Sequence, residues 1–237
     1  MRAGTPPFTP RVRAAGQTAV IAIDGPAASG KSSTAHWVAE RLGFRHIDSG
    51  ALYRAATAVA IRSQPAGGWP EALVLEAASD VRLLPNLTSF VAAVGDEPID
   101  AEIRDAAVTQ HVSAVAKMPR VREWVNEVVR QTARGYDVVV DGRDIGTVVF
   151  PDADLKVFLV ADPWERARRR LTQRLERAPS DDEIAEETER LVQRDSRDAT
   201  QTVQASDAVL IDTTYLTQEE QVERIVTLAR VVLKRGG

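Results

Sequence analysis

Short apolar runs alternate with longer segments of helical period from Thr18 to the end of the chain. The first run, Ala19–Asp24, is apolar and partly β-branched up to its final carboxylate, as expected of a strand buried on both faces. Four similar runs predict further strands at Phe44–Ile47, Val138–Val140, Leu155–Val160 and Ala208–Ile211. Because parallel strands need crossover connections, this alternation predicts a three-layer α/β fold with about five parallel strands flanked by helices.

Apolar side chains recur at helical spacing between these runs. The apolar positions from Ser32 to Leu42 fall on one face, and Gly43 suits the end of that helix. The same period predicts helices at Val121–Arg134, Pro163–Arg177, Asp182–Arg194 and Thr217–Lys234. The polar stretch Ala178–Asp182 joins two highly charged helices and suits the tip of a mobile lid.

Residues 80–100 break the strand–helix alternation. Val81–Leu84 and Phe90–Val94 have the character of short strands, and the four residues from Gly95 to Pro98 form a strong turn signal. This region is therefore predicted to be a small β-containing insert outside the main sheet.

Composition and charge narrow the class of protein. The 237 residues are 44% hydrophobic, which is enough for a substantial core, and the net charge of -4 argues against a general nucleic-acid binder. The absence of cysteine excludes disulfides and thiolate metal sites and fits a reducing cytoplasm, where we expect the protein to act. No run approaches the ~20 apolar residues of a membrane span, and the polar residues 1–18 are predicted to be a disordered extension.

A phosphate-binding loop follows the first strand. Gly25–Ser32 has the pattern G-x-x-x-x-G-K-S, and a predicted helix begins directly after it, so backbone N–H groups converge on one anion. A chance glycine-rich turn is the alternative, which the flanking strand and helix disfavour. Lys31 is expected to reach the β- and γ-phosphates and Ser32 to help hold Mg²⁺. The predicted ATP-binding residues are Gly25, Pro26, Ala27, Ala28, Ser29, Gly30, Lys31, Ser32 and Ser33.

A second acidic position is expected near the metal, at the end of another central strand. Asp141 follows three consecutive valines and suits this place, most simply by holding Mg²⁺ through a water molecule. A strand that ends in Asp is common, so this pattern has weight only in combination with the phosphate-binding loop.

Arginines point to the phosphate-bearing acceptor, because guanidinium groups bind phosphate through two parallel hydrogen bonds. Five of them are expected in loops or at helix ends: Arg54, Arg122, Arg143, Arg194 and Arg197. A run between Arg166 and Arg174 falls on one helix, where a solvated charged face balanced by Glu165 and Glu176 is the simpler interpretation. Some of this run could still close over ATP.

Several longer motifs resemble those of bacterial cytidylate kinases (CMP/dCMP kinases), in the P-loop nucleoside monophosphate (NMP) kinase superfamily. The resemblance extends from about Ala19 to the C-terminus. It is carried by Ile23–Ser33, Asp48–Arg54, Val112–Ala116, Pro119–Arg122, Asp141–Pro151, and Arg194-Asp195 with Asp198. It implies phosphoryl transfer from ATP, with Mg²⁺, to CMP or dCMP by a monomer that binds neither nucleic acid nor membrane. It also implies a core (19–48, 121–164, 196–237), an enlarged NMP-binding lobe (49–120) and a helical lid (165–195).

The resemblance implies roles for the acceptor site. Ser113, Arg122 and Asp144 would face cytosine. A carboxylate can accept a hydrogen bond from the exocyclic amine of cytosine, whereas uracil has a carbonyl at that position. The other implied contacts are Arg54 and Arg143 to the acceptor phosphate, Arg194 and Asp198 to the pentose with Asp198 also tied to Ser113, and Ser49 and Tyr53 along the cleft. The expected catalytic residues are Lys31, Arg143 and Arg194.

One position departs from the family pattern. The family usually has an arginine three residues after Asp198, where this chain has Gln201, which can hydrogen-bond but carries no charge. Either Arg197 or an arginine of the 166–174 helix replaces that charge, or the acceptor site is looser. Another small-acceptor P-loop kinase (UMP/CMP, adenylate or metabolite kinase) is the nearest alternative, and a P-loop regulator or nucleic-acid-dependent ATPase is disfavoured by the acidic charge.

Overall fold

The computed structural model describes residues 18–234. The predicted disordered extension therefore lies, apart from Thr18, outside the described residues. Within the described part of the chain, no helix has the length and apolar character needed to cross a membrane.

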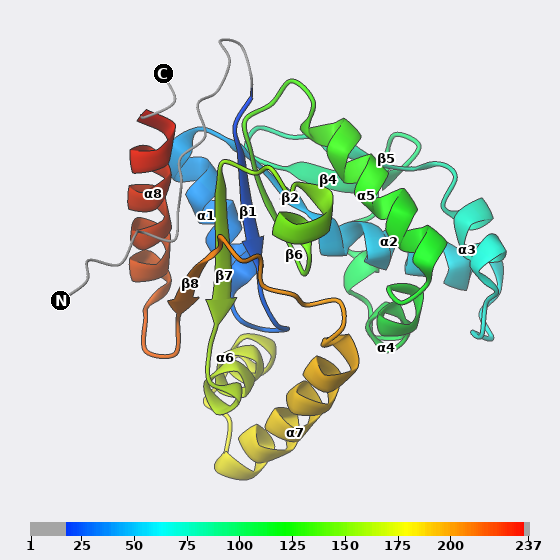
Figure 1. The fold of residues 1–237 in the computed structure, drawn as a ribbon. Coiled ribbons are helices and arrows are strands. Elements are labelled where there is room, and N and C mark those ends of the chain that lie inside the picture. The colour runs from blue at the N-terminus through cyan, green and yellow to red at the C-terminus, as the bar shows by residue number, and fades with distance from the viewer. Residues whose placement is uncertain (1–17, 235–237) are drawn as a thin grey trace.

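A five-stranded parallel sheet forms the centre of the molecule, as the apolar runs predict (Figure 1). Its order is β2-β6-β1-β7-β8, so the strand before the phosphate-binding loop lies in the middle, with Ile21 opposite Val139 on one side and Leu155 on the other. The arrowheads of β1 and β7 point toward α6 and α7 (Figure 1). The strands are β1 (Val20–Asp24), β2 (Arg45–Asp48), β6 (Val138–Gly142), β7 (Leu155–Val160) and β8 (Val209–Asp212).

Helices cover both faces of this sheet, which confirms the predicted three layers. Within β6, Val138 and Val140 join the core under α2 and α5, whereas Val139 joins the core under α1 and α8. This alternation follows from the period of two along a strand, and because both faces are covered, consecutive residues such as Val138, Val139 and Val140 are all apolar. The helices are α1 (Lys31–Leu42), α2 (Ser49–Ser63), α5 (Pro119–Ala133) and α8 (Gln218–Lys234).

The β-containing insert is present and holds one strand more than the sequence predicts. β3 (Val81–Pro85), β4 (Phe90–Val94) and the short β5 (Glu97–Pro98) form an antiparallel sheet. The helices around this insert were not predicted from the sequence. The largest is α2, which is alanine-rich and buried on most sides, so it lacks the amphipathic stripe by which a surface helix is recognised. The others are α3 (Glu71–Ala77), the 3₁₀ turn η1 (Glu102–Arg104) and α4 (Ala106–Val115).

Two charged helices project beyond the carboxyl edge of the sheet, α6 (Pro163–Leu175) and α7 (Asp181–Asp198) (Figure 1). α7 begins with a capping box between Ser180 and Glu183, which explains why the polar link ends there. It extends to Asp198, four residues farther than the sequence predicts. The two helices share a small apolar cluster with the phosphate-binding loop, formed by Ala27, Ala167, Leu171, Ile184 and Leu191.

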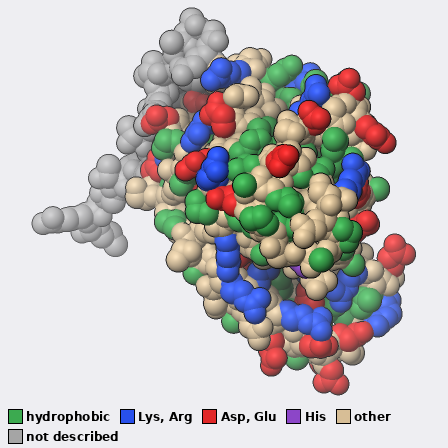
Figure 2. Space-filling model, turned by 90° about the vertical axis from the view of Figure 1, so that its right-hand side faces the viewer, with side chains coloured by type: hydrophobic (Ala, Val, Ile, Leu, Met, Phe, Trp, Pro, Cys, Tyr) green, Lys and Arg blue, Asp and Glu red, His purple; other side chains and the backbone are tan. Residues whose placement is uncertain are grey.

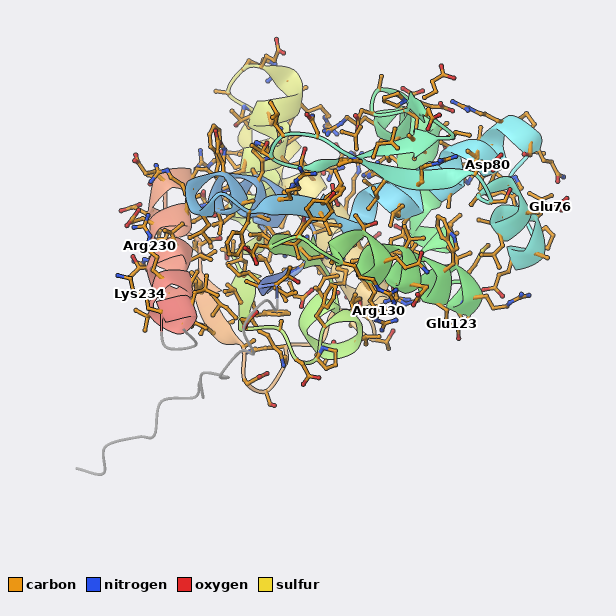
Figure 3. All side chains as sticks on the ribbon, turned by 90° about the horizontal axis from the view of Figure 1, so that it is seen from above. Glu76, Asp80, Glu123, Arg130, Arg230 and Lys234 are labelled. Carbon is orange, nitrogen blue, oxygen red and sulfur yellow. The ribbon has the colours of Figure 1, made fainter. Side chains whose placement is uncertain are left out.

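The short π-helix η2 (Ile145–Val149) follows β6 and accepts hydrogen bonds from a side chain of α5. Arg130 donates from Nη2 to the Val148 carbonyl (2.9 Å) and from Nε to the Val149 carbonyl (3.1 Å). In the view from above, Arg130 lies beside this segment, whereas Glu123 of the same helix points outward (Figure 3). The segment that begins with Asp144 is therefore held by a helix that packs on the main sheet.

Candidate active site

The phosphate-binding loop joins β1 to α1, and its course depends on glycine. Gly25 has φ of 153°, and a Cβ on it would lie 2.3 Å from the carbonyl oxygen of Leu159. Gly30 has φ of 85° and is the N-cap of α1, so no cap side chain covers the free N–H groups of the first turn. The loop thus presents the positive end of α1 to the carboxyl edge of the sheet.

Lys31 and Ser32 place one cation and one hydroxyl at the start of α1. Lys31 Nζ donates to the Pro26 carbonyl (3.0 Å), and burial, aided by the nearby Arg143, lowers the pKa of Lys31 to about 8. An anion at this position would raise the pKa again and so favour the charged form. Ser32 Oγ donates to Asp141 Oδ2 at 2.5 Å, which joins the loop to the end of β6.

Asp141 lies at the centre of a buried polar cluster. It is 1% exposed, and its Oδ1 lies 2.7 Å from His46 Nε2. Burial is the largest single influence on His46 and acts to lower its pKa, but the hydrogen bond to Asp141 and the negative charges of Asp141 and Asp48 together outweigh it, so the pKa is raised. Burial, followed by the charge of Asp141, raises the pKa of Asp48. The side-chain oxygens of Ser32, Asp48 and Asp141 all line the same cavity.

A cavity of about 230 Å³ opens between the phosphate-binding loop, α2, α4, α7 and the end of β6 with the two residues that follow it. All nine predicted acceptor residues line it, although they come from five separate elements or links. Its lining includes Lys31, Ser32, Asp48, Ser49, Tyr53, Arg54, Ser113, Arg122, Asp141, Arg143, Asp144, Arg170, Arg194, Asp198 and Gln201.

One end of the cavity is built around an arginine–carboxylate pair. Arg122 Nη2 donates to Asp144 Oδ2 at 2.5 Å, and Arg122 Nη1 donates to the Ala116 carbonyl at 3.1 Å. Tyr53 lies beside this pair, with its ring centroid 5.8 Å from the guanidinium carbon, and burial raises the pKa of Tyr53 to about 12. A flat aromatic wall, a carboxylate oriented by its arginine and the nearby Ser113 are groups that can read the polar edge of a base.

The other end of the cavity gathers positive charge. Arg143 donates to the Gly25 carbonyl and to Asp198 Oδ2, both at 3.1 Å, and Arg194 Nε lies 3.6 Å from the same carboxylate oxygen. Arg54 donates to the Ile103 carbonyl and to Thr109 Oγ1, both at 3.2 Å. Basic side chains also gather on the lower part of the face shown in Figure 2, where α6 and α7 lie. This end is suited to several phosphate charges.

A second hollow, of about 870 Å³, lies on the other side of the first turn of α1. Gly30 and Ser33 contribute to it, together with Arg168, Arg169 and Arg170 of α6 and the loop at 214–218. Arg169 links α6 to the segment after β8, because its Nη2 donates to the carbonyls of Thr213 (2.6 Å) and Thr214 (2.7 Å). Ala28 and Arg170 line both hollows, so the two meet at the phosphate-binding loop.

Comparison with known proteins decides the family. The family model for cytidylate kinase matches residues 21–231. The chain belongs to the cytidylate kinase family. It is 39% identical over 216 residues to the cytidylate kinase of Acholeplasma laidlawii (strain PG-8A), with 88% of this chain and 93% of the relative covered. The cytidylate kinase of Streptococcus pneumoniae serotype 4 is 42% identical over 217 residues (88% and 96% covered), and that of Chloroherpeton thalassium is 40% identical over 231 residues (91% and 95%).

Membership of the cytidylate kinase family makes this chain an ATP-dependent nucleoside monophosphate kinase, a transferase. The resemblance identified from the sequence motifs is thereby confirmed. Of the predicted ATP-binding residues, Ala27, Ala28, Lys31 and Ser32 line the first cavity, and Ala28, Gly30 and Ser33 line the second hollow. Gly25, Pro26 and Ser29 line neither and act through the course of the backbone.

Two details differ from the sequence analysis. The Asp198 carboxylate contacts Arg143 and Arg194, and within the described structure the expected link to Ser113 is not formed, because two guanidinium groups outcompete a neutral hydroxyl. Arg54 lies inside α2 rather than in a loop or at a helix end. A helix keeps its side chain aimed at the cavity more firmly than a loop would.

Three polar residues of the cavity were not among the predicted site residues: Asp48, Arg170 and Gln201. Asp48 belongs to one of the family motifs, and its position at the end of a buried strand is the sequence feature that could have identified it as a site residue. Arg170 was hidden in a run of arginines. Gln201 was noted only for the charge that it lacks.

Proposed function

We propose that this protein transfers the γ-phosphoryl group of ATP to CMP or dCMP, giving ADP and CDP or dCDP in pyrimidine nucleotide metabolism. The bond between the γ-phosphorus and the β–γ bridging oxygen breaks, its electron pair leaves with ADP, and an acceptor phosphate oxygen bonds to the phosphorus. The single observation that carries the acceptor is the Arg122–Asp144 pair, which lies in the same cavity as the phosphate-binding Lys31.

The donor side is proposed from the two hollows. The first turn of α1 and Lys31 hold the β- and γ-phosphates, and the nucleoside of ATP extends into the second hollow, between Arg169 and the loop at 214–218. The γ-phosphate then lies where the two hollows meet and faces the acceptor cavity.

Mg²⁺ is the metal that fits the donor set. Among residues 18–234, no group of three or more His, Cys, Asp or Glu side chains is arranged to hold a metal. Ser32 Oγ and the Asp141 carboxylate offer hard oxygen donors 2.5 Å apart, so the remaining positions suit water and phosphate oxygens, as Mg²⁺ prefers. When bound, the ion would neutralise charge on the phosphates; Ser32 would hold it directly and Asp141 through water.

Asp144 is the proposed reader of the base. Its carboxylate accepts from the exocyclic amine of cytosine, and it would face an acceptor if uracil were bound. Arg122 orients this carboxylate, and Ser113 lies on the same side of the cavity. The proposed contacts to the rest of the nucleotide are Arg54 and Arg143 with the phosphate, Arg194 and Asp198 with the pentose, and Ser49 and Tyr53 along the wall.

Closure is proposed to exclude water from the phosphates. The acceptor lobe comprises residues 49–120, the lid residues 165–195, and the core residues 19–48, 121–164 and 196–237. An open site would hydrolyse ATP, so movement of the lobe and lid toward the core is part of the proposal. Action as a monomer in the cytoplasm remains a prediction from the sequence.

ADP release across CMP, dCMP, UMP, AMP and GMP tests this function in a coupled assay. We expect CMP and dCMP to stimulate ADP release far above the ATP-only rate and above the other acceptors. The same chain with Lys31→Ala controls for a contaminating kinase. If CMP gave no stimulation, the proposal would be wrong, and a preference for UMP or AMP would move the acceptor to another nucleotide.

A further inference from the structure

A neutral residue occupies the charged end of the acceptor cavity. Gln201 lines the cavity close to the residues that gather phosphate charge, yet it has no charge of its own. Arg197 is exposed on α7 and does not line the cavity, so it does not fill this place. A cation that compensates for the neutral Gln201 therefore has to come from an element other than α7.

Arg170 is the cation of α6 that reaches the reacting region. It lines both the acceptor cavity and the second hollow, so it lies at the junction where a phosphoryl group would pass from donor to acceptor. The other arginines of the run are engaged elsewhere: Arg166 with the Ala27 carbonyl and Asp195, Arg168 with Glu165, Arg169 with the carbonyls of Thr213 and Thr214, and Arg174 half-exposed outside the acceptor cavity.

Glu187 of α7 holds Arg170 in this position. Its Oε1 lies 2.8 Å from Arg170 Nε, and the residue is only 4% exposed. Arg190 (3.6 Å) and Arg174 (3.8 Å) approach its other oxygen from the solvent side. A carboxylate this deeply buried needs a charged partner, and Arg170 provides the shortest contact. The contact at Nε is an ion pair without a hydrogen bond, and it leaves the two terminal nitrogens of Arg170 for a phosphate.

We propose that Glu187 is a positioning residue for phosphoryl transfer. Its carboxylate fixes Arg170 across the junction of the two hollows, and Arg170 binds the phosphoryl group in transfer and supplies the charge that Gln201 lacks. The inference rests on the proposed function. Because Glu187 belongs to α7 and Arg170 to α6, the same ion pair couples the relative position of these two helices to the completion of the site.

A double-mutant cycle in the CMP assay tests this role. Arg170→Gln should lower kcat on the order of 100-fold, because a charge on the transferred group is no longer neutralised. Glu187→Gln, which keeps the shape but not the charge, should lower kcat about 10-fold and change the KM for ATP by less than about threefold. In the Arg170→Gln background, Glu187→Gln should have no further effect. Arg197→Gln is the control, at an exposed arginine of α7 that lines neither hollow, and it should leave kcat within about twofold.

Charge restoration provides a readout that a purely structural role would not change. Adding Gln201→Arg to Arg170→Gln should recover about 10-fold in kcat, because the guanidinium returns to the same end of the cavity. The melting temperature of each variant is measured in parallel. If Glu187→Gln does not melt cooperatively, Glu187→Asp, which keeps the charge but shortens the reach, takes its place in the cycle with the same expectations.

The inference is overturned if removal of the Glu187 charge leaves kcat unchanged, or if its effect is equally large with and without Arg170. A failure of Gln201→Arg to rescue any activity would contradict the role given to Arg170. A wild-type protein without CMP-stimulated ADP release would instead contradict the proposed function itself, and the inference with it. An active wild type with insensitive variants contradicts the inference alone.

Discussion

The donor and acceptor sides of the cavity are built in different ways. The phosphate-binding part of the donor side is one continuous segment, residues 25–33, and its shape comes from the backbone, with positive φ at Gly25, Ala28 and Gly30. The acceptor side is assembled from side chains that lie far apart in the sequence, such as Arg143 and Asp198. The first is specified by local sequence, the second by the fold.

This difference predicts how each side responds to substitution. On the donor side, we expect backbone N–H groups to provide most of the contacts to the phosphates, with Lys31 as the main side chain. On the acceptor side, charges come in pairs, so loss of one partner leaves the other unpaired in a buried place. We therefore expect loss of rate from the donor side and loss of selectivity from the acceptor side.

Lys31→Ala should have the largest effect. Removing the cation at the β- and γ-phosphates should lower kcat on the order of 1,000-fold with every acceptor, because this charge acts on the transferred group whatever the base. The measurement is ADP release with CMP, dCMP and UMP. Lys117→Ala, at an exposed lysine outside the cavity, is the control and should retain the wild-type rate. An acceptor-dependent loss would remove the distinction between the two sides.

Asp144→Ala should have a smaller and selective effect. We expect kcat/KM for CMP to fall on the order of 100-fold, because the amine of cytosine loses its acceptor and Arg122 loses its partner. UMP, which has a carbonyl at that position, should lose much less, so the ratio of CMP to UMP turnover falls. Equal losses for both acceptors would mean that Asp144 supports the cavity without reading the base.

The same contrast explains what could be predicted from the sequence. Ala19–Asp24 and the loop after it could be predicted because strand, glycines and lysine are neighbours in the chain. The motifs also named the acceptor residues, but only through resemblance to a family. The position of Arg170 could not be predicted, since it depends on how α6 packs against the loop and α7. The alanine-rich α2 was missed because burial on most sides removes the period that marks a surface helix.

Asp24 connects the strand before the phosphate-binding loop to the segment that follows Asp144. It is the last residue of β1, directly before the phosphate-binding loop, and its carboxylate accepts from the backbone N–H groups of Ile145 and Gly146, each at 2.8 Å. These two residues follow Asp144, so the segment that carries the proposed base reader is hydrogen-bonded to β1. Burial raises the pKa of Asp24 from 3.8 to about 6, even though these two hydrogen bonds act to lower it.

Asp24→Asn should change the pH dependence of stability. Between about pH 4 and pH 6 the folded wild-type protein binds more protons at Asp24 than the unfolded chain does, so this residue's contribution to stability falls as pH rises. The contribution should fall on the order of 2 kcal/mol across this window. Urea unfolding at pH 4, 5, 6 and 7 measures it as the difference between wild type and Asp24→Asn. The asparagine also loses one backbone hydrogen bond, but that loss is independent of pH, so only the slope of the difference is diagnostic. A difference that stays constant from pH 4 to pH 7 would mean that Asp24 ionises as an ordinary aspartate and stays charged over this whole range, which would contradict the prediction.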